Sequence, residues 1–143
     1  NPTSKMSKSD PSGCVFLMDK PEEIARKFKR AITDSDTENC VHYDPENKPG
    51  VANLMSIYSS VTGESFEEIE KEFSGRGYGD FKPAVGDAVI ETLRPIRESA
   101  EKMIAEKAYL QEVYTNGAQK ASAIARKTLR KVYKKVGFVE KPF

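Results

Sequence analysis

The stretch Val51-Ala52-Asn53-Leu54-Met55-Ser56-Ile57-Tyr58-Ser59-Ser60-Val61 decides the fold class of this chain. Its apolar side chains recur every three or four residues and surround much of a helix, which indicates an α-helix buried on most sides. Gly63 follows shortly after, where a left-handed residue would end such a helix. The sequence therefore predicts a largely buried core helix over residues 51–61.

Capping-box pairs mark the starts of two further helices. Asp19 can cap a helix whose third position is Glu22, and apolar residues at helical spacing then continue to about Thr33. Ser65 and Glu68 form a second such pair, which opens a short helix with a Glu-rich face. We therefore expect one helix before the core helix and one directly after it.

Two longer helical patterns complete the chain. One opens at Pro83, and Pro95 is expected to kink it. The other begins near Asn116 and ends at Gly137. Because no segment shows the alternation of a strand, we predict an all-α fold, a helical bundle of about five helices.

Length and composition exclude several classes of protein. The chain has 143 residues, which suits one domain, and 23 Lys and Arg against 22 Asp and Glu give a formal net charge of +1. No apolar run approaches the roughly 20 residues that cross a bilayer, so we expect no membrane insertion. Two cysteines, Cys14 and Cys40, cannot form a disulfide framework, and we expect free thiols in the cytoplasm. We interpret the start at Asn1 as a cut through a longer chain.

Charge that cancels over the whole chain does not cancel locally. Residues 64–80 are acidic, with six carboxylates against Lys71 and Arg76. Residues 116–141 are basic, with Glu140 as the only acidic residue among the cations Lys120, Arg126, Lys127, Arg130, Lys131, Lys134, Lys135 and Lys141. The last predicted helix therefore carries a basic stripe.

The string Lys5-Met6-Ser7-Lys8-Ser9, followed by Asp10-Pro11, combines two ammonium groups and two hydroxyls in a Pro-, Ser- and Gly-rich loop. Lysines neutralise phosphate oxygens, and hydroxyls and backbone N–H groups supply directed donors. The residue types therefore suit triphosphate binding, although a solvated basic linker has the same composition.

This string resembles the K-M-S-K-S signature of class I aminoacyl-tRNA synthetases, whose loop clamps ATP. Four further stretches extend the resemblance over essentially the whole chain: residues 31–35, 43–54, 78–82 and 125–133. Together they resemble the C-terminal part of the bacterial-type tryptophanyl-tRNA synthetases.

The resemblance implies a ligase that activates tryptophan with ATP, accompanied by Mg2+, and transfers it to tRNA(Trp), working as a homodimer. It implies catalytic roles for Lys5 and Lys8 at the phosphates. The ATP-binding set that it implies is Lys5, Met6, Ser7, Lys8 and Ser9.

One departure from the family concerns histidine. The second class I signature, H-I-G-H, needs two histidines, and this chain has only His42. The family carries that motif and the tryptophan pocket in an upstream Rossmann-like α/β domain. We therefore expect residues 1–18 to be the nucleotide loop and the end of the connection to that domain, and residues 19–143 to be the helical tRNA- and anticodon-binding domain. Alone, the 143 residues are expected to be inactive.

The basic helix suits the tRNA-binding role, since cations along one stripe contact phosphates without reading sequence. The residues predicted for this role are Arg126, Lys127, Arg130 and Lys131. A solvated cationic helix is the alternative for each of them. Tyr78 and Phe81 could stack on an unpaired base, but we favour an anchoring role in the core.

Other interpretations remain open from sequence. A free-standing RNA-binding helical module would keep the basic helix without catalysis, and the related tyrosine–tRNA ligases share the catalytic architecture. No metal site is expected, because Cys14, Cys40 and His42 lack the paired spacing of zinc ligands. We interpret His42 as a turn residue rather than a general base.

Overall fold

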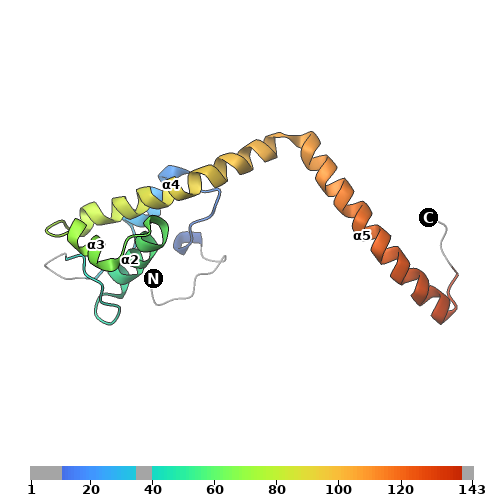
Figure 1. Ribbon diagram of the computed structural model, residues 1–143, viewed down its shortest axis with the longest axis horizontal. Coiled ribbons are helices and arrows are strands. Elements are labelled where there is room, and N and C mark those ends of the chain that lie inside the picture. Colours follow the sequence, from blue (N-terminus) through green and yellow to red (C-terminus); the bar gives the residue numbers. More distant parts are fainter. Residues whose placement is uncertain (1–10, 35–39, 140–143) are drawn as a thin grey trace. The chain divides into compact units, whose positions relative to one another are not determined.

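The computed structural model describes residues 11–34 and 40–139, and these contain five α-helices and no β-strand (Figure 1). The all-α prediction of about five helices is confirmed. The chain divides into two compact units, unit 1 over Asn1–Glu98 and unit 2 over Ser99–Phe143. The elements are the 3-10 turn η1 (Pro11–Gly13) and the helices α1 (Pro21–Lys29), α2 (Pro49–Thr62), α3 (Phe66–Glu72), α4 (Tyr78–Ala105) and α5 (Lys107–Val136).

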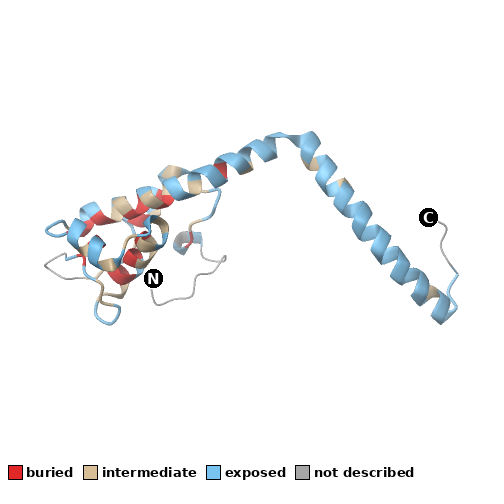
Figure 2. Ribbon diagram, viewed as in Figure 1, coloured by how far each residue is buried: buried red, intermediate tan, exposed pale blue. Residues whose placement is uncertain are grey.

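Unit 1 holds the hydrophobic core. Figure 2 shows buried positions along α2 and the first part of α4, and the sequence-predicted core helix α2 supplies Val51, Leu54, Met55 and Tyr58. Tyr58, Phe73 and Phe81 form an aromatic cluster with ring centroids 5.0–6.2 Å apart. Edge-to-face rings of this kind stabilise a core beyond the area that they bury.

Two of the predicted helix ends are confirmed. Gly63 ends α2 with a left-handed φ of 83°, and its N–H donates to the Ser59 carbonyl. Ser65 caps α3 through a complete capping box with Glu68. Short-range capping chemistry decides both positions, which explains why sequence locates them.

The predicted capping box at the start of α1 is wrong. Lys20 is the N-cap and makes no side-chain hydrogen bond, while the Asp19 carboxylate binds Phe16 N–H and Lys27 instead. The helix starts at Pro21, a residue that fits the first turn because its missing N–H has no helical partner there. It ends at Lys29, earlier than the predicted Thr33.

The starts of the two long helices also differ from the prediction. α4 begins at Tyr78, five residues before Pro83, and continues through Pro83 and Pro95. Burial of Tyr78 and Phe81 on one face explains this earlier start. α5 begins at Lys107 rather than near Asn116, since nothing in residues 107–115 breaks a helix. The predicted kink at Pro95 stays a prediction.

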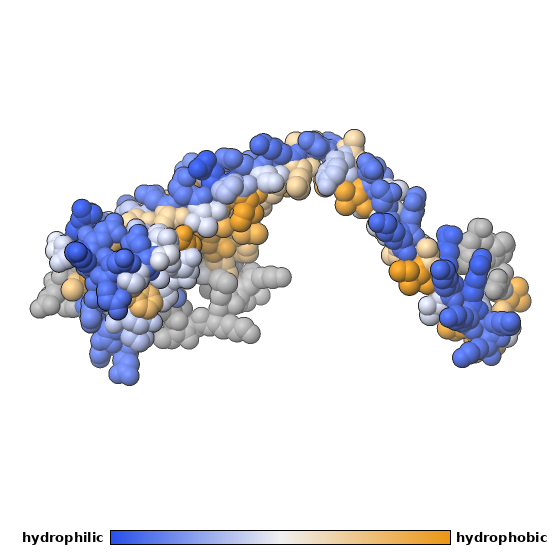
Figure 3. Space-filling view, in the orientation of Figure 1, coloured by the Kyte–Doolittle hydropathy of each residue, from blue (hydrophilic) through white to orange (hydrophobic). Residues whose placement is uncertain are grey.

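Unit 2 consists of the end of α4, α5 and the residues after it. α5 contains no buried residue, and Figure 3 shows both hydrophilic and hydrophobic side chains on its surface. Its C-terminal end is built as predicted: Gly137 has φ 74°, and Phe138 N–H donates to the Tyr133 carbonyl at 3.0 Å. The rings of Tyr133 and Phe138 meet edge to face, which completes the cap.

Candidate functional site

The basic face of α5 is formed by Arg126, Lys127, Arg130, Lys131, Lys134 and Lys135, all of which are exposed. These residues form two neighbouring rows at i, i+4 spacing, one starting at Arg126 and the other at Lys127. One hundred degrees of rotation per residue places both rows on one half of the helix. The structure therefore gathers all four predicted tRNA-binding residues on a single surface.

No acidic residue offsets this surface along the helix, because the sequence has no Asp or Glu from Val113 to Val139. The other half of α5 carries apolar side chains, including Leu129, Val132 and Val136, which are 39–57% exposed. Exposed cations at this density attract a polyanion, and their long stems adapt to irregular phosphate spacing. The arrangement suits contact with phosphates.

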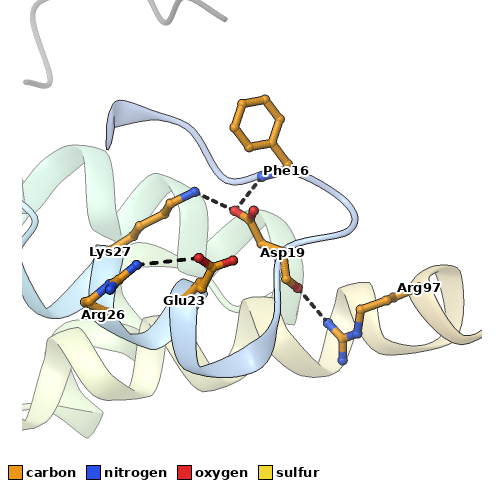
Figure 4. Close-up of polar contacts among 6 residues, drawn as sticks. All are labelled: Phe16, Asp19, Glu23, Arg26, Lys27 and Arg97. Atoms are coloured by element: carbon orange, nitrogen blue, oxygen red, sulfur yellow. Dashed lines mark hydrogen bonds and ion pairs between the residues drawn. The ribbon is translucent and has the colours of Figure 1, made fainter. Parts of the chain in front are cut away.

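The predicted ATP-binding residues Lys5, Met6, Ser7, Lys8 and Ser9 lie outside the described residues. The chain downstream of them is firmly held. Cys14 is buried, and its N–H donates to the Pro11 carbonyl at 3.4 Å. Five residues after Cys14, Asp19 forms polar contacts with Phe16, Lys27 and Arg97 (Figure 4).

The Asp19 anchor consists of Asp19, Phe16, Lys27 and Arg97. Asp19 Oδ2 accepts a hydrogen bond from Phe16 N–H at 3.0 Å and lies 2.5 Å from Lys27 Nζ. The Asp19 carbonyl oxygen accepts a hydrogen bond from Arg97 Nη1 at 3.3 Å. The Lys27 ammonium also lies 5.2 Å from the centre of the Phe16 ring. One residue thus joins the segment before α1 to α1 and to α4.

The electrostatics of the anchor favour the ionised carboxylate. Burial acts to raise the pKa of the Asp19 carboxyl, but the hydrogen bonds from Lys27 and Phe16 and the charge of Lys27 outweigh it, so the pKa is lowered. Asp19 and Lys27 are only 13% and 19% exposed. The sequence pattern predicts Asp19 as a helix cap and gives no role to Arg97. In the sequence, only the spacing of Asp19 and Lys27, eight residues apart across the start of α1, indicated that these two side chains could pair.

Tyr78 and Phe81 are anchors, as predicted. Phe81 is fully buried, and the Tyr78 hydroxyl lies 2.8 and 3.0 Å from the Asp34 carboxylate oxygens and 3.1 Å from the Cys40 carbonyl. Burial and the hydrogen bond to Asp34 raise the pKa of Tyr78 to about 12. Neither ring presents a free face for stacking on a base.

The connector before α2 is tied to α3. His42 Nδ1 lies 2.9 Å from Glu70 Oε1, and the same oxygen accepts a hydrogen bond from Tyr43 N–H. Tyr43 stacks on Phe66 with centroids 3.9 Å apart. His42 therefore makes a structural contact with α3 just before the turn at residues 45–47, and its interpretation as a turn residue stays a prediction.

Two other sequence expectations concern cysteines and metals. Cys14 is buried, Cys40 is exposed, and no disulfide joins them. Within residues 11–34 and 40–139, no group of three or more His, Cys, Asp or Glu side chains could hold a metal ion. In the same part of the chain, no helix is long and apolar enough to cross a membrane.

Comparison with known proteins identifies the class. The family described as tRNA synthetases class I (W and Y) matches residues 1–94. The chain belongs to this family, which confirms the resemblance seen in the K-M-S-K-S string and the four further stretches.

Individual relatives point to the tryptophan branch. The tryptophan–tRNA ligases of Oceanobacillus iheyensis and Wolinella succinogenes are each 49% identical to this chain, over 98% and 97% of its length. The tryptophanyl-tRNA synthetase structure from Mycoplasma pneumoniae has a TM-score of 0.65 and 28% identity, and the match covers 98% of this chain and 44% of that one. The chain spans about 42% of the length of the two curated relatives.

Proposed function

We propose that this chain acts within a tryptophan–tRNA ligase, to which it contributes the ATP-binding loop and a tRNA-binding helix. The observation that carries the proposal is identity of 49% to tryptophan–tRNA ligases over 98% and 97% of the chain. The reaction would activate tryptophan with ATP and Mg2+ and transfer it to tRNA(Trp). A soluble cytoplasmic homodimer is part of the same proposal.

In the proposed division of labour, residues 1–18 belong to the nucleotide loop and its connection, and residues 19–143 to the helical tRNA-binding domain. Lys5 and Lys8 would stabilise charge on the phosphates as pyrophosphate leaves, and Met6, Ser7 and Ser9 would hold the loop against the nucleotide. Removing one such preorganised interaction costs about 2.7–4 kcal/mol in the transition state.

The test of the catalytic half is ATP–pyrophosphate exchange by the product of the complete reading frame, with tryptophan and tyrosine assayed side by side. We expect exchange with tryptophan only, and Lys8→Ala should lower the rate about 100- to 1000-fold while tryptophan affinity stays unchanged. Exchange with tyrosine only would assign the chain to the tyrosine branch. An unchanged rate in Lys8→Ala would remove Lys8 from the mechanism.

The basic face of α5 supports the tRNA-binding half. The double variant Lys127→Gln, Lys131→Gln should weaken binding of a tRNA(Trp) transcript. The plot of log affinity against log salt concentration should also become less steep, by about one unit of slope for each phosphate that the variant no longer neutralises. Lys71→Gln, an exposed lysine on α3, is the matched control. Equal binding by both variants would exclude the α5 face as a tRNA-binding surface.

A free-standing RNA-binding module is the alternative function, and the basic face is the observation that favours it. It predicts tRNA binding without exchange by the complete product. The two assays together therefore separate the two functions.

A further inference from the structure

The turn over residues 16–19 carries apolar side chains at its tip. Asp19 N–H donates to the Phe16 carbonyl at 3.0 Å, and Phe16 N–H donates to Asp19 Oδ2, so hydrogen bonds close both ends of the turn. Its two central residues are Leu17 and Met18, which are both exposed. Gly, Pro, Asn, Asp and Ser dominate turns that face water. A turn tip made of Leu and Met therefore suits contact with an apolar surface.

Two neighbouring side chains extend this apolar surface. Phe16 begins the turn, and Ile96 on α4 is close to it because the next residue, Arg97, donates from Nη1 to the Asp19 carbonyl at 3.3 Å. Figure 3 shows hydrophobic side chains gathered beside the middle of α4. The turn patch consists of four residues that are each 40–56% exposed: Phe16, Leu17, Met18 and Ile96.

Arg97 adds a positive charge at the edge of the turn patch. Its side chain is 8% exposed, and within residues 11–34 and 40–139 the bond to the Asp19 carbonyl is its one hydrogen bond. No buried side-chain nitrogen or oxygen in the same ranges lacks a partner, so the Nε and Nη2 atoms of Arg97 reach the surface. Figure 4 shows one terminal nitrogen directed away from Asp19. A largely buried guanidinium with unused donors favours a carboxylate, which can accept two of them at once.

The composition of this surface is typical of an interface between proteins or domains. Aromatic residues, Met and Arg are enriched in interfaces, and exposed apolar patches with a polar rim mark docking surfaces. Hydrogen bonds and the ion pair with Lys27 hold the turn, so docking costs little ordering of its backbone. A nucleic acid fits poorly, because phosphate contact needs several exposed cations and this surface has one that is largely buried.

The relatives indicate what covers the turn patch. The chain matches the C-terminal portion of the tryptophan–tRNA ligases and spans about 42% of their length, so these relatives contain a larger N-terminal portion. We infer that the turn patch and Arg97 dock the N-terminal portion of the complete protein, through an apolar surface that presents an Asp or Glu carboxylate to Arg97. The inference rests on the proposed function, because that portion is expected here if the chain acts within such a ligase.

The test is site-specific photocross-linking in the product of the complete reading frame. Leu17→p-benzoylphenylalanine places a photoreactive group at the turn tip, and mass spectrometry identifies the segment that it joins. We expect cross-links within one chain to residues upstream of Asn1. Met18→p-benzoylphenylalanine should give the same segment, whereas Lys71→p-benzoylphenylalanine, at an exposed position on α3, should not.

Each other outcome of the cross-linking would overturn the inference. Cross-links that join two chains would assign the turn patch to self-association. Cross-links to tRNA would assign it to nucleic acid. Cross-links confined to the 143 residues, or none at all, would show that the N-terminal portion does not cover this surface.

A second measurement isolates the charge of Arg97. In the Leu17→p-benzoylphenylalanine background, Arg97→Met removes the guanidinium but keeps an unbranched apolar side chain, and Arg97→Lys restores a cation. The cross-link yield should fall by about threefold or more in Arg97→Met and recover in part in Arg97→Lys.

Two controls accompany the Arg97 variants. Arg94→Met removes an exposed cation of α4 that pairs with Glu91, and Val89→Ala lowers the stability of the core by removing buried methyl groups. Both should leave the yield unchanged. A yield in Arg97→Met equal to that of either control would exclude the carboxylate contact at Arg97.

ATP–pyrophosphate exchange by the same product separates this inference from the proposed function. Tryptophan-dependent exchange without cross-links upstream of Asn1 would overturn the inference alone. Those cross-links without exchange would overturn the proposed catalytic function and support the docking surface.

Discussion

Unit 1 and α5 show two uses of an amphipathic helix. The helices of unit 1 place their apolar faces in a common core, where Ile24, Met55, Ile69 and Phe81 are fully buried. α5 has 30 residues and an equally periodic sequence, yet Ile124 is 70% and Leu129 is 39% exposed. Periodicity therefore predicts the helix in both regions but predicts burial only in one.

The two regions also use charge differently. In unit 1 several charged groups are paired at short range, and the pair in the Asp19 anchor holds the backbone before α1. On α5 the cations lie in rows with no acidic residue among them, where they can act on a partner. The charge pairs of unit 1 thus stabilise its own fold, whereas the rows of cations on α5 suit the tRNA-binding role that we propose for this helix.

The largest expected effect is on the core. Phe81→Ala should lower the free energy of unfolding by about 3–5 kcal/mol, because it removes a buried ring that contacts Tyr58 and Phe73. Leu129→Ala on α5 should cost less than about 1 kcal/mol, since Leu129 is 39% exposed and α5 contains no buried residue. Urea denaturation of both variants measures the difference. Equal destabilisation would show that α5 is covered in solution.

The second prediction concerns the Tyr78–Asp34 hydrogen bond of unit 1. Tyr78→Phe should cost about 1.5–3 kcal/mol near neutral pH, the range for a hydrogen bond to a charged group. The pKa of Tyr78 is raised from 10.0 to about 12, so its contribution is complete below pH 10 and is lost as pH rises to about 12. Wild-type stability should therefore fall by about 1.4 kcal/mol per pH unit across that window, in addition to any change shared with the variant.

Urea titrations of wild type and Tyr78→Phe at several pH values test this sign. The variant lacks the titrating phenol, so the gap between the two proteins should narrow above pH 10. A gap that stays constant to pH 12 would mean that the hydroxyl gains nothing from its folded environment.

Sequence predicted the parts of the fold that depend on neighbours along the chain. The Gly63 and Gly137 caps and the Ser65 capping box are local, and their positions are confirmed. The start of α4 could not be predicted from Pro83, because it depends on the burial of Tyr78 and Phe81 against distant residues. The prediction of Asp19 as a helix cap is wrong for a similar reason. Its neighbours in sequence are compatible with a cap and also with the observed pairing to Lys27, and the contact of its carbonyl with Arg97 spans 78 positions.

The candidate site divides in the same way. The basic face of α5 follows from helical spacing alone, so its four predicted residues could be placed together from sequence. The residue types of the K-M-S-K-S string identify it in the sequence. The Asp19 anchor, which follows it along the chain, could not be predicted, since the sequence alone does not show which carboxylate will pair with Lys27. Charge patterns are visible in sequence, whereas the pairing of a charge is a property of the fold.

The third prediction compares two glycines within unit 1. A Cβ on Gly50 would lie 2.4 Å from the Ile32 carbonyl oxygen, which is backbone and cannot move aside cheaply. A Cβ on Gly86 would lie 3.5 Å from the Phe28 Cβ, an ordinary contact. Gly50→Ala should therefore cost about 1–3 kcal/mol, whereas Gly86→Ala should be neutral or stabilise its helix by up to about 1 kcal/mol. Thermal unfolding of the pair checks this, and equal melting points would contradict the close approach of α2 to residues 32–33.

The smallest effect on stability is expected on α5. Lys131→Gln should change the free energy of unfolding by no more than about 0.5 kcal/mol, because the side chain is exposed and no acidic residue lies near it in sequence. The same substitution in unit 1, Lys27→Gln, should cost about 1–3 kcal/mol, since it leaves a partly buried Asp19 carboxylate without its cation. The order of the two variants should reverse for tRNA binding.

Lys131→Gln should lower the affinity for tRNA and make it less dependent on salt, whereas Lys27→Gln should leave both quantities unchanged. Measurements of unfolding and of tRNA binding on both variants test whether stability and tRNA binding depend on different regions of the chain. A joint decrease of stability and tRNA binding in Lys131→Gln would show that α5 needs its charges for its structure.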